Sequence, residues 1–430
     1  MKIKFSLIVI FTVLSPGILF SQKILSLKEC YDLAIVKSSL AGEADAYSSI
    51  SRLNDENLKK GWLPTLDANA NAVYNSDVVD FSKTLGAIPG MSHLITPMPH
   101  DQYKVTLDVN QVIYDGGAIK SGRAIEKADQ DINRKQTESD MYKLREQINT
   151  YYFNVMLLRR QKELLTNYLG LIQKRISSME SARNNGVIFR SDIDVLTSEK
   201  VKTDQQLKEN ELRSNSLLKI LSDLTGTNID NSVEFVLPDQ GEEIKTEILR
   251  PELQLYDLRK EKLSAGLQME QSKRMPKAFG FATLGYGKPP GQDFFKDSFG
   301  PYYVVGAGIK WNIFDWNRVK NTKEVITIQQ GIIDNRKKDL TDNLKRLLEA
   351  KSAEISSLQA LMGSDAELIA IRKRITASSE SQYQNGVITA TEYLSQMNAE
   401  QQALINFEIH KINLALAKVE YLNISGNEIH

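Results

Sequence analysis

The sequence predicts an α+β membrane protein, built as a tandem repeat of long coiled-coil-like helical hairpins that carries four amphipathic strands. Three observations predict this fold class. Short motifs recur 200 positions apart, which indicates an internal repeat. Two long stretches contain no proline and are rich in good helix formers. Four segments of about ten residues alternate apolar and polar side chains, as strands of membrane barrels do.

The first 21 residues have the organisation of a secretory signal peptide. Lys2 and Lys4 precede an apolar run over residues 5–14, and Ser21 fits the last position before a cleavage site. The run is too short to span a bilayer, which takes about 20 apolar residues in a helix. It also has no polar face, which argues against a helix of the folded core. We therefore expect a signal peptide over residues 1–21 and export from the cytoplasm.

Composition excludes several classes of protein. The 54 basic and 54 acidic residues balance and form no basic block, which argues against nucleic acid as a partner. Cys30 is the only cysteine, so neither an internal disulfide nor a cysteine-based zinc site is expected. No apolar stretch after the signal reaches the roughly 18 residues of a membrane-spanning helix. The mature chain is therefore expected either to be soluble or to cross a membrane through strands.

The internal repeat divides the chain into two similar halves. Asn-Gly-Val-Ile at 185–188 recurs at 385–388. Ile-Tyr-Asp at 113–115 recurs as Ile-Phe-Asp at 313–315. Each repeat is expected to hold an opening helix, two strands and a helical hairpin, in that order. The assigned segments are 22–226 for the first repeat, 227–249 for a linker or equatorial segment, and 250–430 for the second repeat.

The proline-free stretches predict the helical hairpins. No proline lies between Pro99 and Pro238, and none lies after Pro301. We expect hairpins over residues 118–226 and 318–426. Their first helices would be about 100 Å long at about 1.5 Å per residue. An Asn-Gly pair would form each turn, because glycine readily adopts the left-handed backbone that ends a helix.

The amphipathic segments predict strands at residues 64–76, 103–114, 277–287 and 302–314. Aromatic residues gather near both ends of these segments, as in the two aromatic girdles of membrane barrels. The alternation is weaker in 277–287, which is rich in glycine and aromatic residues. A soluble sandwich is less favoured, because four strands are too few to close one in a chain of this length. Since hydrocarbon does not tolerate open sheet edges, we expect several copies to share one barrel.

Five short motifs follow one another in a fixed order along the chain. They are Leu-Ser-Leu-Lys-Glu-Cys at 25–30, Trp-Leu-Pro at 62–64, Ile-Tyr-Asp-Gly-Gly at 113–117, Arg-Pro-Glu-Leu at 250–253 and Asn-Gly-Val-Ile at both hairpin turns. Each motif is weak alone, but their order within a tandem repeat is fairly specific. In this order the chain resembles the TolC-like outer-membrane efflux protein family, over nearly the whole mature sequence.

The resemblance implies a homotrimer whose twelve strands form one β-barrel in the outer membrane and whose helices form a tunnel through the periplasm. It implies the function of an outer-membrane channel, the exit duct of a tripartite efflux or type I secretion system. The implied partners are a periplasmic adaptor (membrane fusion) protein, an inner-membrane transporter and outer-membrane lipid. The chain departs from the family pattern in having no acidic residue at Ser395 and in ending soon after Gly426.

The resemblance also implies two sets of functional residues beside the hairpin turns. The set expected at the pore aperture is Asp192, Glu392, Tyr383 and Arg183. The set expected to contact the adaptor is Asn185, Gly186, Val187, Asn385, Gly386 and Val387. Asp192 and Glu392 have a second interpretation, as carboxylates at helix starts that favour the helix dipole. Both interpretations can hold together.

The sequence contains no catalytic or cofactor-binding constellation that we recognise. Its four histidines do not pair with cysteine or carboxylates at metal spacing, and phosphate-binding loops and nucleophile elbows are missing. We expect no enzyme activity, no cofactor and no metal. Met91, His93, Met98 and His100 are donors that suit copper, although an ordinary external loop is the favoured interpretation. One alternative function is a soluble periplasmic coiled-coil scaffold. The other is a secreted hydrolase, which would need a catalytic constellation that the sequence does not contain.

Overall fold

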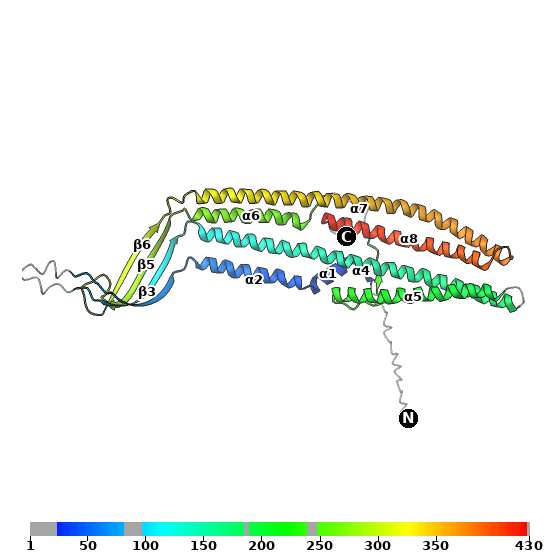
Figure 1. The fold of residues 1–430 in the computed structure, drawn as a ribbon, viewed down its shortest axis with the longest axis horizontal. Helices are drawn as coiled ribbons and strands as arrows, with labels where there is room; N and C mark the ends of the chain where they lie inside the picture. Colours follow the sequence, from blue (N-terminus) through cyan, green and yellow to red (C-terminus); the bar gives the residue numbers. More distant parts are fainter. Residues whose placement is uncertain (1–23, 81–96, 185–188, 239–246, 428–430) are drawn as a thin grey trace, which may run out of the picture.

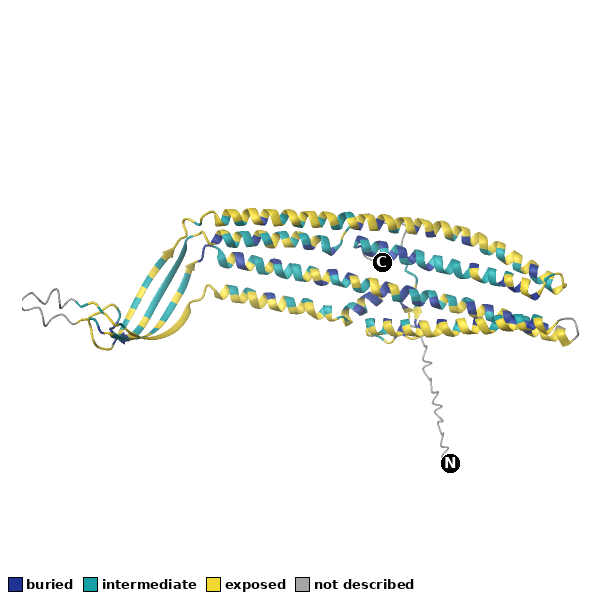
Figure 2. Cartoon of the chain, in the orientation of Figure 1, coloured by how far each residue is buried: buried dark blue, intermediate teal, exposed yellow. Residues whose placement is uncertain are grey.

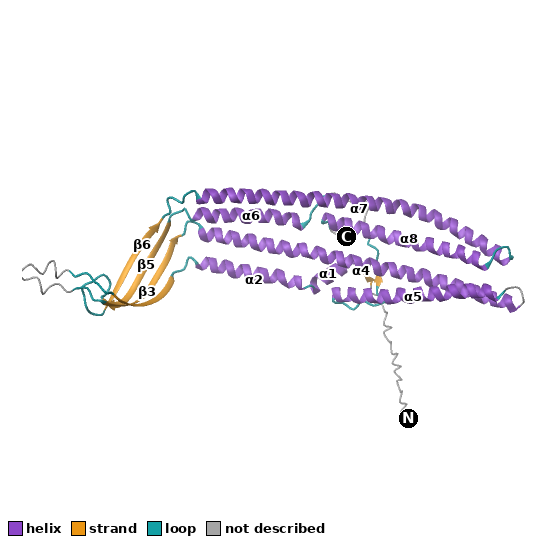
Figure 3. Ribbon diagram, in the orientation of Figure 1, coloured by secondary structure: helices purple, strands orange, loops and turns teal. Residues whose placement is uncertain are grey.

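The computed structural model describes residues 24–80, 97–184, 189–238 and 247–427. The expected signal peptide, the first hairpin turn with Asn185, Gly186 and Val187, and part of the Met/His loop lie outside these residues. In the described part, an antiparallel sheet lies at one end of a long layer of helices (Figure 1). The helices run side by side along most of the length of the molecule (Figure 3).

The helices form two long antiparallel hairpins with shorter helices beside them. They are α1 (Leu27–Lys37), α2 (Ser39–Lys60), α4 (Ala118–Asn184), α5 (Arg190–Thr225), α6 (Pro251–Ser272), α7 (Arg318–Gln384) and α8 (Ala390–Ser425). α4 packs on α5, and α7 packs on α8. In the half nearer the sheet, the layer order is α2, α4, α6, α7 (Figure 1). Among the described helices, none combines the length and apolar character needed to cross a membrane.

The opening helix of the first repeat, expected to be one helix, is broken into two. Ser38 has an extended backbone, with φ of −63° and ψ of 140°. Its N–H bonds to the Ala34 carbonyl at 2.9 Å and so ends α1. Its hydroxyl accepts from the N–H of Leu40 at 3.2 Å and so caps α2. One serine therefore ends one helix and starts the next.

The sheet places the two strand pairs of the repeats side by side. Its strands are β2 (Thr65–Tyr74), β3 (Asp101–Tyr114), β5 (Lys277–Lys288) and β6 (Gly300–Lys310), all antiparallel, in the order β2-β3-β5-β6. The strand expected over residues 302–314 ends earlier than expected. Lys310 pairs with Lys277, the first residue of β5, so residues 311–314 lie beyond the last rung.

The two faces of the sheet differ in chemistry. On one face Tyr303, Val305 and Ile309 are 76%, 74% and 77% exposed. On the other face polar side chains bond to each other, as Asn69 does to Asp108 at 2.9 Å. No element of the described chain packs over the apolar face. A sheet with one apolar and one polar face is the form that lipid on one side and water on the other require.

The recurring Ile-aromatic-Asp motif starts the two longest helices. The Asp115 carboxylate accepts from the N–H groups of Gly117, at 2.8 Å, and Ile119, at 2.5 Å. The Asp315 carboxylate accepts from the N–H of Val319 at 3.1 Å. A carboxylate at this place satisfies the first free N–H groups of a helix and favours its dipole. The motif is therefore a device that turns the chain from strand into helix in both repeats.

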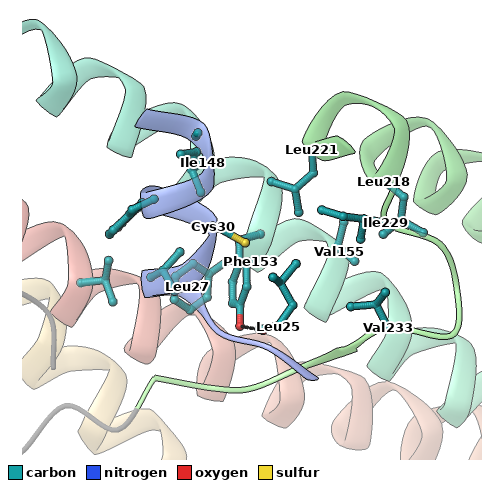
Figure 4. Packing of buried hydrophobic residues seen from close by; sticks show 14 of the residues in the cluster. Leu25, Leu27, Cys30, Ile148, Phe153, Val155, Leu218, Leu221, Ile229 and Val233 are labelled. Atoms are coloured by element: carbon teal, nitrogen blue, oxygen red, sulfur yellow. Dashed lines mark hydrogen bonds between the residues drawn. The ribbon is translucent and has the colours of Figure 1, made fainter. Parts of the chain in front are cut away.

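The best-buried core lies midway along the helices, away from the sheet (Figure 2). There α1 and the short strand β1 (Ile24–Leu25) pack against α4, α5 and α8 (Figure 4). β1 pairs in parallel with β4 (Glu234–Phe235), which belongs to the segment between the repeats. Burial raises the pKa of the Cys30 thiol to about 12, so this thiol stays protonated within the core.

Tyr152 is expected to hold these short strands to the core. Its side chain is fully buried, and its hydroxyl lies 2.9 Å from the Leu25 carbonyl and 2.7 Å from the Val236 carbonyl. Tyr152→Phe keeps the ring but leaves these polar groups unpaired. We expect the free energy of unfolding to fall by about 1–3 kcal/mol. Denaturant unfolding followed by near-ultraviolet circular dichroism measures this fall.

Tyr151→Phe is the matched control, because Tyr151 is half-buried on the same helix and is not bonded to these strands. Equal unfolding midpoints for Tyr152→Phe and the parent would show that the hydroxyl contributes nothing.

Candidate functional site

The turn between α7 and α8 is the hairpin tip that the structure describes. The N–H of Gly386 bonds to the Tyr383 carbonyl at 3.0 Å. The N–H of Val387 bonds to the Gln382 carbonyl at 2.8 Å. These two bonds form a Schellman motif, which ends a helix at a left-handed residue. Gly386 has a φ of +70°, and a Cβ there would meet nothing within 4 Å. Backbone conformation, and not crowding, therefore favours glycine at this position.

Glu392 belongs to a capping box at the start of α8. Its carboxylate accepts from the N–H of Thr389 at 2.8 Å and from the Thr389 hydroxyl at 3.0 Å. The Thr389 hydroxyl oxygen in turn accepts from the N–H of Glu392 at 3.2 Å. The bonds from the backbone N–H and the hydroxyl of Thr389 hold the pKa of Glu392 below its ordinary value of 4.5. Glu392 is therefore an exposed, charged carboxylate that also stabilises the helix start.

The start of α5 differs from the start of α8. Phe189 holds the N-cap position, 200 residues before Thr389, and its side chain makes no capping bond in the described chain. Its side chain is 80% exposed. Asp192 lies in the first turn of α5, where its charge favours the helix dipole. The two hairpins share a turn motif, but they start their second helices by different means.

Tyr383 and Asp192 are brought together although they belong to different hairpins. Burial raises the pKa of Tyr383, and the nearby negative charge of Asp192 raises it further. The Tyr383 ring stacks on that of Tyr393, with centroids 5.5 Å apart and planes 9° apart. Its hydroxyl is buried and lacks a hydrogen-bond partner among the described residues. Arg183 and Glu392, the other expected aperture residues, lie exposed in the turns nearest the tips.

A contact that the sequence did not predict joins the two hairpins. Arg175 of α4 forms an ion pair with Glu380 of α7 and donates to the Tyr393 hydroxyl of α8 at 3.2 Å. Its guanidinium also lies 5.1 Å from the centre of the Tyr393 ring, a cation–π contact. Arg175 and Glu380 are 205 positions apart, so no local pattern signals their pairing. The one available signal for Glu380 is its position three residues before Tyr383, which places it on the same face of the helix as an expected aperture residue.

An apolar cluster surrounds this contact and extends the attachment between hairpins. Its buried residues are Tyr168, Ile172, Ile176, Met179, Ile193, Leu196, Ala390, Tyr393 and Met397. The Tyr168 hydroxyl donates to Asn398 Oδ1 at 2.5 Å. A cavity of about 450 Å³, lined in part by Arg175 and Glu380, lies beside the cluster. In the part of the chain that the structure describes, no group of His, Cys, Asp and Glu could hold a metal ion.

Known proteins share this fold. Residues 52–226 match the family described as outer membrane efflux protein. No curated protein matches the chain. Among solved structures, the chain is similar to CusC, with a TM-score of 0.72 and 12% identity over 94% of this chain and 92% of that chain. It is similar to the outer membrane protein VceC of Vibrio cholerae, with a TM-score of 0.68 and 14% identity over 94% and 97% of the two chains. It is also similar to the CmeC outer membrane channel of Campylobacter jejuni, with a TM-score of 0.66 and 13% identity over 93% and 85%.

The family match and the shared fold confirm the resemblance that the sequence predicted. They support the expected function of an efflux exit duct, and the alternative of a soluble scaffold is not favoured.

Thr389→Ala is expected to loosen the start of α8. Losing the N-cap hydroxyl costs about 1 kcal/mol of helix stability. The lowered pKa of Glu392 means that its charged form stabilises the fold above its ordinary pKa of 4.5, and that this contribution is lost as pH falls through the lower folded pKa. Hydrogen-exchange protection factors in the first turn of α8 should therefore fall in the variant at pH 7, and in the parent only in acid.

Thr391→Ala serves as the control, because Thr391 is exposed in the same turn and outside the capping box. Unaltered protection in Thr389→Ala at neutral pH would contradict the capping role.

Proposed function

Since residues 52–226 match the outer membrane efflux protein family and the fold is shared with outer-membrane channels, we propose that this chain is the outer-membrane exit duct of a tripartite efflux or type I secretion system. It passes substrates from an inner-membrane pump across the periplasm and the outer membrane. One observation carries the proposal: an amphipathic four-stranded sheet lies at the end of helices of 67 residues, which are about 100 Å long. The sheet lies in the outer membrane, and the helices lie in the periplasm.

The open edges of the sheet call for neighbouring copies. β2 and β6 are each paired on one side only in the described chain. In hydrocarbon each unpaired backbone group costs several kcal/mol, so neither edge can stay open there. The outer helices of the layer, α2 and α7, are also largely exposed (Figure 2). Three copies joined β6 to β2 would close twelve strands into one barrel and continue the helices into a tunnel, as a homotrimer.

The hairpin tips form the contact with a periplasmic adaptor protein. The described tip, between α7 and α8, lies at the end of the helices farthest from the sheet (Figure 1). The contact residues are Asn185, Gly186, Val187, Asn385, Gly386 and Val387. Val387 supports this assignment, because its apolar side chain is 71% exposed at the turn. The inner-membrane transporter completes the assembly, and outer-membrane lipid surrounds the sheet.

The pore aperture lies beside the same tips. It is formed by Asp192, Glu392, Tyr383 and Arg183. In a trimer, Asp192 and Glu392 bring six carboxylates toward one axis, and rings of carboxylates favour cations in narrow pores. The capping role of Glu392 is compatible with a pore role, because its bonds to Thr389 favour the charged form.

The alternative is a soluble periplasmic coiled-coil scaffold. It would leave Tyr303, Val305 and Ile309 in contact with water on one continuous face. Soluble proteins rarely expose large apolar patches of this kind unless a partner or a membrane covers them. The exit duct is therefore the favoured function.

The assembly is tested by mass and by conductance. Protein extracted in detergent should have the mass of three subunits, because four strands do not close a barrel alone. The same material should open channels in planar bilayers. A monomer that stays in solution without detergent and opens no channel would instead establish the scaffold.

The aperture is tested by cation block. Divalent or trivalent cations on the helix side should block the current, and Asp192→Asn combined with Glu392→Gln should weaken the block on the order of tenfold, because a charge pair at about 4 Å is worth ~1 kcal/mol even in water. Glutamine retains the capping box, so the double variant removes charge and not the cap. Thr389→Ala is the converse control, because it removes the cap and keeps both charges. A double variant blocked as strongly as the parent would place the acidic ring elsewhere.

A further inference from the structure

The second strand pair carries aromatic residues directly opposite glycines. In the register of β5 with β6, the pairs are Phe279 with Gly308, Phe281 with Gly306, and Gly285 with Tyr302. Because side chains alternate along a strand, all three pairs lie on one face of the sheet, opposite Tyr303 and Val305. This is the polar face that also carries Asp108, since Asp108 pairs with Thr283 between these rungs.

The rings occupy the space above the glycines. A Cβ on Gly306 would lie 2.5 Å from the Phe281 ring, and a Cβ on Gly308 would lie 2.6 Å from the Phe279 ring. The two rings have centroids 6.4 Å apart and form one aromatic surface. Both are half-exposed, so each keeps an accessible part. This packing explains why apolar and polar residues alternate only weakly over 277–287.

A negative region adjoins this aromatic surface. Asp108 accepts from the hydroxyls of Thr283, at 2.5 Å, and Thr106, at 2.8 Å, and from the Asn69 amide at 2.9 Å. These donors are neutral, and among the described residues Asp108 takes part in no ion pair. Asp67 lies directly opposite Asp108 in the register of β2 with β3, so two carboxylates share one rung.

The neighbouring charges confine this negative region. Lys104 is four residues from Asp108 on the same strand, about 13 Å away. Lys277 and Lys310 pair at the helix end of the face, two residues beyond the rung of Phe279. Phe281 is a diagonal neighbour of Asp108 in the register of β3 with β5, at about 7–8 Å between the two strand positions. The Tyr302 ring lies over Gly285, which is the other diagonal neighbour of Asp108.

We propose that Asp108 and the ring of Phe281 form a subsite for organic ammonium cations on the polar face of the sheet. The faces of aromatic rings attract such cations. The apolar groups around their charge lower the cost in hydration free energy of leaving water, and the carboxylates supply the opposite charge. The subsite rests on the proposed function, because this face lines a lumen only when the sheet closes into a channel. It gives the wall of the barrel a preference for organic cations, separate from any selectivity at the aperture beside the hairpin tips.

The test uses the full-length protein in planar bilayers, with benzyltrimethylammonium added on the side of the strand loops. This cation should lower the conductance at concentrations at which neutral benzyl alcohol does not. Asp108→Asn and Phe281→Leu should each raise the half-blocking concentration by about threefold or more, since an exposed cation–π contact is worth that much. Phe281→Tyr keeps an aromatic ring, so the cation should block this variant at the same concentration as the parent. Tyr303→Leu changes an aromatic residue on the opposite face, so the cation should block it at the same concentration as the parent too.

Three results would overturn the subsite. If Asp108→Asn and Phe281→Leu channels conduct normally and the cation blocks them as it blocks the parent, neither residue belongs to a cation subsite. Equal action of benzyl alcohol and the cation would remove the role of charge. A parent that opens no channel would overturn the proposed function itself, and the subsite with it. If Phe281→Leu fails to assemble, Asp108→Asn and Phe281→Tyr decide the outcome.

Discussion

The outer edges of β2 and β6, which are unpaired in the described chain, are the constraint on which the rest of the structure depends. Backbone N–H and C=O groups at an open edge find no partner in hydrocarbon. A sheet of four strands meets this requirement in a bilayer only by joining other sheets, so in the proposed assembly each chain is one sector of a larger barrel. The helical layer continues the sector, with α2 and α7 at its sides. Its best core is accordingly local, where α1 and β1 fasten onto α4, α5 and α8.

The two repeats share a scaffold but differ in the devices that it carries. α4 and α7 have equal lengths of 67 residues, and α5 and α8 have equal lengths of 36. Asp115 and Asp315 start the long helices in the same way. Yet Thr389 caps α8, whereas the start of α5 at Phe189 has no side-chain cap among the described residues. Rings over glycines are found in the second strand pair, whereas Asp67 and Asp108 belong to the first. Duplication supplied the frame, and the local chemistry lies in the differences.

A fold shared with VceC at 14% identity shows that this architecture tolerates wide divergence in sequence. Many different residues satisfy the alternation of polar and apolar side chains and the length of the helices. Gly226 and Gly426, with φ of 67° and 80°, end α5 and α8 where few other residues would do so without strain. Most positions between such points need only the right polarity, so sequences diverge while the arrangement persists.

The sequence by itself determined the elements of this protein, because helices and strands follow from local periodicity and from proline and glycine. The long hairpins and the four strands lie close to their expected ranges, and the signal peptide stays a prediction. The misplaced end of the last strand and the break at Ser38 had non-local or side-chain causes: the length of β5, and one hydroxyl that caps a helix. Of the expected aperture residues, the fold brought Asp192 near Tyr383, whereas Arg183 and Glu392 are exposed. Only the tertiary structure decided that Arg175 meets Glu380 and that Phe281 covers Gly306. Such pairs depend on register and packing between segments distant in sequence, and no local pattern encodes which side chains then meet.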